Sequence, residues 1–249
     1  MSTETIRIAK GLSIASPWPA LLIEKENMLI VADLHLGLED EQESKGIHIP
    51  TTVFPKIMNS VLTPAKELGC DKVVITGDFK HEFGKPSEAE WYSVKKMIRG
   101  IREIKAEPLV IRGNHDNYII LLLKEMNVKL FQPSLSINGL TLFHGHLEPT
   151  EKEEKAKHII MGHEHPSIVI KDDLGVKHRF KAFLTGKVGK KTVTVLPSSS
   201  PLSYGSDMNE TLKKDLLSPI LQKSPLCDFV PYAIEIGVAV KRFPKLGSL

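Results

Sequence analysis

The chain has 249 residues, of which 41% are hydrophobic and 25% are charged, as in an ordinary globular protein, and we expect a single domain over residues 1–249. Its 33 basic and 30 acidic residues leave a net charge of +3, which does not by itself indicate a nucleic-acid-binding protein. Two cysteines, Cys70 and Cys227, are too few for a disulfide framework or a cysteine-based zinc site.

The first half of the chain alternates short β-branched runs with helical patterns. Strands are predicted at 28–33, 72–78 and 108–116, and helices at 52–68, 88–104 and 117–126. A capping box, Ser87 to Glu90, marks the start of the second helix. This order predicts a sheet covered by helices. The longest apolar run, Tyr118 to Leu123, is too short to cross a membrane. The N-terminus lacks a signal-peptide pattern, so we expect a cytoplasmic protein.

From about residue 128 onward, strand patterns replace helical ones. We expect this half to be mostly sheet packed on the first half, with hairpin turns at 136–139 and 172–175. Serines, prolines and glycines between Ser198 and Ser218 predict a long surface loop. The sequence does not define its path, and one hypothesis has residues 198–208 overhanging the functional site.

Polar residues follow five of the apolar runs at the point where each run ends. They are Asp33 and His35, Asp78 and His81, Asn114 with His115 and Asp116, His144 and His146, and His163 and His165. These clusters hold seven of the ten histidines. Because the carboxyl ends of strands in open α/β sheets form one rim where ligands bind, we expect the clusters to converge.

Histidine and carboxylate ligands together favour borderline divalent metals such as Zn, Mn, Fe, Co or Ni. Seven good candidates are too many for one ion, which accepts about four protein ligands, but they suit two ions bridged by a carboxylate. Asp78 is the natural bridge, because it follows a strongly strand-like run and Gly77 permits close backbone approach. Two ions about 3.5 to 4 Å apart can clamp the oxygens of a phosphoryl displacement. The pattern therefore predicts hydrolysis of phosphate esters.

The five motifs are Asp-x-His, Gly-Asp-x-x-His, Gly-Asn-His-Asp, His-Gly-His and Gly-His-x-His, in that order from Asp33 to His165. Together they resemble the calcineurin-like metallophosphoesterase superfamily. The phrases ADLHLGLE, GDFKHEFG and IRGNHD are most similar to its small SbcD-like and PdeM-like (ligase-associated) phosphodiesterases. The resemblance implies an α/β fold, a four-layer α/β/β/α sandwich of two mixed sheets, with a dinuclear metal site at one edge.

The resemblance also implies an activity and roles for the residues. The expected enzyme hydrolyses phosphodiester bonds of nucleic acid (DNA or RNA) or nucleotides, using a metal-bridging hydroxide and a histidine acid. The cofactors would be two divalent ions, Mn foremost and Fe, Zn, Ni or Co as alternatives. One ion would bind Asp33, His35, Asp78 and His165, and the other Asp78, Asn114, His144 and His163. Three further residues would be catalytic, namely His115 as the acid, Asp116 orienting it, and His81.

Several alternatives stay open. His146 is either a supporting residue behind the ligands or an ordinary loop residue, and Lys80 and Arg112 are either phosphate contacts or solvated cations. A phosphomonoesterase or nucleotide pyrophosphatase would use the same site and differ in its preference between monoesters and diesters. A non-catalytic scaffold of the same fold would tend to lack the histidine of Gly-Asn-His, which is present here as His115. No membrane partner is expected, and the sequence identifies no protein partner.

Overall fold

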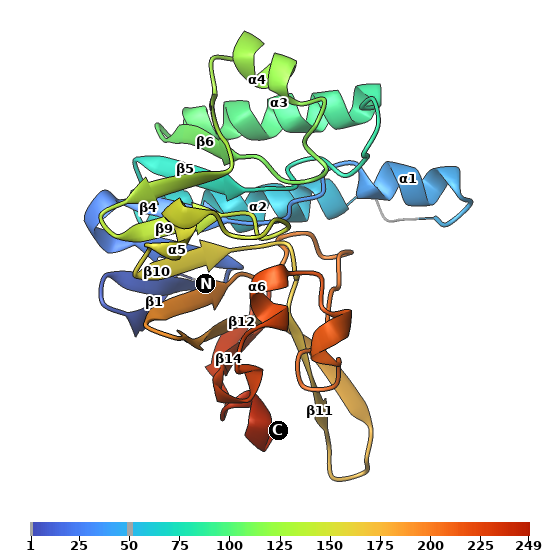
Figure 1. Cartoon of the computed structure of the whole chain (residues 1–249). Coiled ribbons are helices and arrows are strands. Elements are labelled where there is room, and N and C mark those ends of the chain that lie inside the picture. The colour runs from blue at the N-terminus through green and yellow to red at the C-terminus, as the bar shows by residue number, and fades with distance from the viewer. Residues whose placement is uncertain (1, 49–51) are drawn as a thin grey trace.

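Two mixed β-sheets lie face to face, with helices on their outer sides, in the computed structural model (Figure 1). The structure describes residues 2–48 and 52–249. Within those residues, no helix is both long and apolar enough to span a bilayer. The arrangement confirms the predicted α/β sandwich of two mixed sheets.

The first sheet has seven strands within the described residues, and their spatial order follows the sequence. They are β1 (Glu4–Ala9), β2 (Leu12–Ser16), β3 (Ala20–Ile23), β4 (Met28–Val31), β5 (Lys72–Thr76), β6 (Glu107–Ile111) and β7 (Lys129–Phe131). Strands β1 to β4 are antiparallel, whereas β4 to β7 are parallel. The parallel strands are joined through α1 (Leu38–Ser44), α2 (Val53–Glu67), α3 (Glu88–Glu103) and α4 (Ile120–Glu125).

The second sheet has eight strands in the described part of the chain, in the order β15-β14-β12-β13-β10-β9-β8 with β11 paired to β12. Its strands are β8 (Ser134–Ile137), β9 (Leu140–Phe143), β10 (His158–Met161), β11 (Ser167–Lys171), β12 (Lys177–Val188), β13 (Lys191–Val195), β14 (Val230–Glu235) and β15 (Ala239–Arg242). Its short helices are α5 (Glu151–Glu154) and α6 (Pro219–Gln222). The β11–β12 hairpin projects away from both sheets (Figure 1).

Three apolar clusters hold these layers together. The first joins the outer face of the first sheet to α2, α3 and α4 through residues such as Val61, Met97 and Leu122. The second fills the space between the sheets, where Ile30 and Val74 share a cluster with Phe183. The third lies under the short helices on the outer face of the second sheet. Each fully buried aliphatic side chain contributes about 1.5–3 kcal/mol, so these clusters stabilise the packing of the layers that carry the ligand-bearing loops.

The structure confirms most of the predicted elements and corrects three. Strands β1, β2 and β3 were not predicted, because the runs are short and Pro17 and Pro19 interrupt them. Helix α4 begins at Ile120 rather than at 117, after a turn. The segment that begins at Ser198 is not a surface loop there, since Ser198, Ser199 and Ser200 are buried. The 136–139 and 172–175 turns connect antiparallel pairs as expected.

Candidate metal centre

The ligand-bearing loops follow the ends of five strands. Strands β4, β5 and β6 are parallel neighbours, as are β9 and β10 in the second sheet. Their carboxyl ends therefore face the same edge of the sandwich, and backbone hydrogen bonds link the loops: Asp33 N donates to Gly77 O at 3.2 Å, and His163 N donates to Asp33 Oδ2 at 2.9 Å. Residues 130 positions apart in the sequence thus meet at one rim.

One group of possible metal ligands comprises Asp33, His35 and His165, whose ligand atoms lie within 4.8 Å of one another. His165 Nε2 lies 3.5 Å from Asp33 Oδ2 and 3.2 Å from His35 Nε2. His35 Nε2 is also 4.0 Å from Asp78 Oδ2. The structure therefore brings together the four residues predicted for the first ion.

A second group comprises Asp78, His144 and His163, again within 4.8 Å. His144 Nε2 lies 3.3 Å from Asp78 Oδ2 and 3.0 Å from Asn114 Oδ1. These are the four residues predicted for the second ion. Asp78 lies between the groups, because its Oδ2 is near both His35 and His144, as a bridging carboxylate requires.

The hydrogen-bond partners of three histidines turn Nε2 toward the centre. His144 Nδ1 donates to Thr76 O at 3.1 Å, His165 Nδ1 contacts Ser203 Oγ at 2.8 Å, and His35 Nδ1 lies 3.2 Å from His81 Nδ1. An outward partner on Nδ1 leaves the Nε2 lone pair for a cation. Asp33 Oδ1, moreover, is buried without a hydrogen-bond partner among the described residues. The donor set fits divalent metal ions.

Backbone geometry at the rim is strained in the way functional sites often are. Five of the seven predicted ligands have a positive φ, namely Asp33 (53°), His35 (45°), Asp78 (48°), His163 (68°) and His165 (46°). Two glycines permit the close approach of the loops. A Cβ on Gly77 would lie 2.0 Å from His144 Nδ1, and one on Gly113 would lie 2.1 Å from Asp78 Oδ1.

Electrostatics couple the two acidic ligands to His144. Burial would raise the pKa of Asp78, but the charge of His144 outweighs it and holds that pKa well below its usual range. Burial would lower the pKa of His144, but the charge of Asp78 raises it to about 9. Burial, followed by the charge of His144, lowers the pKa of His163 to about 3. Without metal, His144 is therefore the histidine that holds a proton against Asp78, and metal binding must release that proton.

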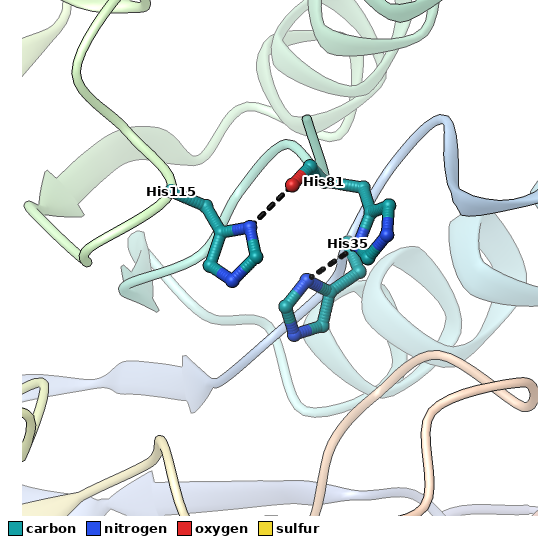
Figure 2. A group of neighbouring side chains, drawn as sticks. All are labelled: His35, His81 and His115. Atoms are coloured by element: carbon teal, nitrogen blue, oxygen red, sulfur yellow. Dashed lines mark hydrogen bonds between the residues drawn. The ribbon is translucent and has the colours of Figure 1, made fainter. Parts of the chain in front are cut away.

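Figure 2 shows His35, His81 and His115 as neighbours, with dashed lines for the bond from the His115 ring to the His81 backbone oxygen and for the contact between the His81 and His35 rings. His115 Nδ1 donates to the backbone oxygen of His81, and His115 Nε2 lies 3.8 Å from Asp78 Oδ2. The expectation that Asp116 orients this ring needs correction. The Asp116 carboxylate accepts the backbone N–H groups of Phe79 (3.0 Å) and Gly113 (2.8 Å), so it joins the two loops that carry Asp78 and His115.

The ring of His81 connects a carboxylate to a predicted ligand. His81 Nε2 lies 2.5 Å from Glu41 Oε2, and His81 Nδ1 lies 3.2 Å from His35 Nδ1. The hydrogen bond from Lys45, followed by the one from His81, lowers the pKa of Glu41, so the carboxylate is ionised and accepts. His81 then carries its proton on Nε2 and accepts from His35 Nδ1, which leaves His35 Nε2 unprotonated. The sequence leaves Glu41 open between a group that supports the ligands and an ordinary loop carboxylate, because helix α1 was not predicted.

The segment after β13 reaches the rim, where two of its serines contact predicted ligands; these contacts place it at the site but do not show that residues 198–208 overhang it. Ser198 Oγ donates to Asp33 O at 2.7 Å, and Ser203 bonds His165 as described above. The buried Lys181 ammonium donates to three carbonyls of this segment, on Ser198 (3.1 Å), Ser200 (2.5 Å) and Ser203 (2.6 Å). Lys181 thus holds the segment that supports two of the predicted ligands, although nothing in its local sequence indicated this.

Two remaining candidates have clear positions. His146 lies next to two predicted ligands, with ring centroids 5.1 Å from His144 and 5.9 Å from His163, and its Nδ1 is buried without a hydrogen-bond partner in the described structure. Lys80 is fully buried, and its ammonium donates to the backbone oxygens of Glu82 and Gly84. Its side chain is therefore neither solvated nor turned toward a phosphate.

Comparisons with known proteins agree with this fold. Residues 27–147 match the model of the calcineurin-like phosphoesterases. Among solved structures, the chain is similar to the nuclease MPE of Pseudomonas putida, with 17% identity, a TM-score of 0.68, and coverage of 97% of this chain and 100% of that one. The phosphoesterase Yfce of E. coli is 18% identical over 70% of this chain and 80% of its own, with a TM-score of 0.39. No curated protein matches.

The fold and the clustered ligands define a hydrolase, a metal-dependent phosphoesterase. The segment that matches the calcineurin-like phosphoesterase model, residues 27–147, carries five of the predicted ligands: Asp33, His35, Asp78, Asn114 and His144.

Proposed function

We propose that the chain is a dinuclear phosphodiesterase that acts on nucleic acids or nucleotides. The two ligand groups that share Asp78 support two ions. Mn is the metal we expect, because the carboxylate and amide oxygens suit it, and Fe, Zn, Ni or Co are the alternatives, since imidazole suits several of them. When bound, the ions would lower the pKa of a water molecule and neutralise charge on the phosphoryl oxygens. The full-length similarity to a protein described as a nuclease supports the choice of substrate class.

The preference for a diester rests on the nearby cations. A phosphate monoester carries one more negative charge than a diester at neutral pH, and sites for monoesters gain from a cationic side chain. Lys80 is fully engaged by backbone oxygens, and the Arg112 guanidinium donates to the side chains of Asn117 and Gln132. Neither cation is directed at a substrate, which favours the diester over the monoester alternative.

His115 is the acid in this proposal. Its bond to the His81 carbonyl fixes the ring and leaves Nε2 near Asp78, on the side of the predicted metal ligands. From there Nε2 can deliver a proton to the leaving oxygen. Burial lowers the pKa of His115, so the negative charge of a bound phosphate is needed to keep the ring protonated. Asp116 and His81 act by holding the loops and the ring in place.

The test is hydrolysis of bis(p-nitrophenyl) phosphate with added Mn²⁺, compared with the monoester p-nitrophenyl phosphate and then with single-stranded oligonucleotides. We expect the diester to be cleaved faster than the monoester, and the oligonucleotides to be cleaved as well. Asp78→Asn and His115→Ala should each lose at least about 100-fold in kcat, in the range typical of acid–base groups. Full activity in either variant, or a monoester preference, would overturn the proposal.

We further propose that residues 1–249 act as one domain in the cytoplasm. Residues from both sheets are buried in one apolar cluster, which supports a single domain. The free thiols of Cys70 and Cys227 support a reducing compartment such as the cytoplasm. Limited proteolysis that released a stable half of the chain would contradict the single domain, and fractionation of cells that express a tagged chain would test the location.

A further inference from the structure

Phe83 occupies an unusual place for a large apolar side chain. It follows His81 in the loop between β5 and α3, and it is 56% exposed. Its ring stacks on the His115 ring, with centroids 3.6 Å apart and planes inclined by 30°. Since His115 covers one face, the exposed surface consists of the other face and the ring edge. An apolar surface therefore borders the group proposed to act as the acid.

The loop that carries Phe83 is held on both sides of it. The ammonium of the buried Lys80 donates to the backbone oxygens of Glu82 and Gly84, the two residues that flank Phe83. The backbone N–H of Glu82 donates to Glu90 Oε1 of α3 at 2.8 Å. A charge buried in this way is costly unless it is well bonded, and here the bonds fix the backbone from which the ring is presented. Phe83 is thus positioned before any ligand arrives.

We propose that the outer face of Phe83 is a stacking platform for a nucleobase beside the scissile phosphate. Bases stack on exposed aromatic side chains with little dependence on sequence, because every base has a π-face. A ring in contact with His115 places such a base next to the leaving oxygen. The inference rests on the proposed diesterase function and narrows its substrates to single-stranded nucleic acid or nucleotide diesters, whose bases are free to stack.

The size of the effect follows from measured stacking. Loss of an aromatic partner costs about 1–3 kcal/mol per base, and about 1.4 kcal/mol corresponds to a factor of ten. We therefore expect the wild type to favour an intact single-stranded oligonucleotide over the same strand with abasic sites by roughly tenfold in kcat/KM. Phe83→Leu should bring that ratio close to one, whereas Phe83→Trp should keep it.

Tyr92→Leu is the matched control. Tyr92 is a similarly exposed aromatic on α3, but its ring lies 5.4 Å from the Lys96 ammonium rather than against a site residue. Its substitution should leave the wild-type ratio unchanged. The platform is refuted if Phe83→Leu keeps the wild-type ratio, or if Tyr92→Leu lowers it equally.

A binding measurement without catalysis separates this inference from the function itself. In Phe83→Trp with metal removed, the tryptophan emission should be quenched by the intact oligonucleotide and not by an abasic strand of equal length. Tyr92→Trp should show no such quenching. Equal quenching by both strands would show phosphate binding without stacking and overturn the platform. Failure of the wild type to hydrolyse any diester would instead count against the proposed function alone.

Discussion

Glu41 offers the sharpest test of how this chain prepares a metal ligand. Its carboxylate accepts a hydrogen bond from His81, which accepts one from His35, and the chain of bonds leaves His35 Nε2 ready to bind an ion. Glu41→Ala removes the acceptor at the start of that chain. His81 can then carry its proton on Nδ1, where it no longer accepts from His35. We expect weaker metal binding at the group formed by Asp33, His35 and His165.

The magnitude follows from the geometry. A hydrogen bond to a charged group contributes about 1.5–3 kcal/mol, and the 2.5 Å distance from Glu41 to His81 belongs to this class. The Glu41 side chain is 30% exposed and also bonds Lys45, so the low end of that range applies. About 1.4 kcal/mol is a factor of ten, which is also the low end for loss of a partner behind a metal ligand. We predict a tenfold weaker affinity.

Titration calorimetry with Mn²⁺ at fixed pH measures this affinity without reference to catalysis. Glu41→Gln keeps an acceptor but loses the charge, so its loss should be smaller than that of Glu41→Ala. Glu43→Ala changes an exposed carboxylate on the same helix, and Lys45→Ala removes a different partner of Glu41. Both controls should bind as the wild type does. Wild-type affinity in Glu41→Ala, or an equal loss in Glu43→Ala, would refute the reasoning.

Three further predictions concern metal and stability. A chelator should abolish hydrolysis of bis(p-nitrophenyl) phosphate, and added Mn²⁺ should restore it in the colorimetric assay. A non-glycine residue in a left-handed conformation costs about 1–2 kcal/mol. Gly77→Ala should lower the free energy of unfolding by more than that, because the added Cβ meets His144. Gly189→Ala also has a positive φ but open space around it, so denaturant melts should show only the conformational cost. Burial lowers the pKa of His158 to about 4. As the pH falls, the unfolded chain takes up this proton before the folded chain does, so the free energy of unfolding drops by about 3 kcal/mol between pH 6.5 and 4. His158→Gln should remove that part of the pH dependence.

The predicted ligands were accessible from the sequence because each one directly follows a buried strand. The apolar runs that end at Val31, Thr76 and Ile111 are parallel neighbours, and a parallel sheet necessarily brings their ends to one edge. The same logic applies to Phe143 and Met161 in the second sheet. No knowledge of loop paths was needed to expect the ligands to converge, since the strand order alone implies it.

The residues behind the ligands could not be predicted in this way. Ser203 meets His165 across 38 positions, and Ser198 meets Asp33 across 165. Such contacts depend on how a long segment folds back, and Lys181 fixes that path through backbone oxygens that any sequence would offer. Phe83 was hidden for another reason, because its role depends on the direction in which an irregular loop presents it. Sequence periodicity carries no information about either.

The rim concentrates the unfavourable terms of the fold. Asp33 and Asp78 are buried carboxylates with left-handed backbones, and a non-glycine residue in that conformation costs on the order of 1 kcal/mol or more. The second sheet and the segment after β13 hold this geometry in place through Ser198 and the N–H of His163. Because a cation would offset the repulsion between the two carboxylates, metal binding and stability are linked, and the free energy gained rises with metal concentration as RT ln(1 + [L]/Kd). Packing in the rest of the sandwich therefore offsets the cost of holding the rim residues in the arrangement that metal ions require.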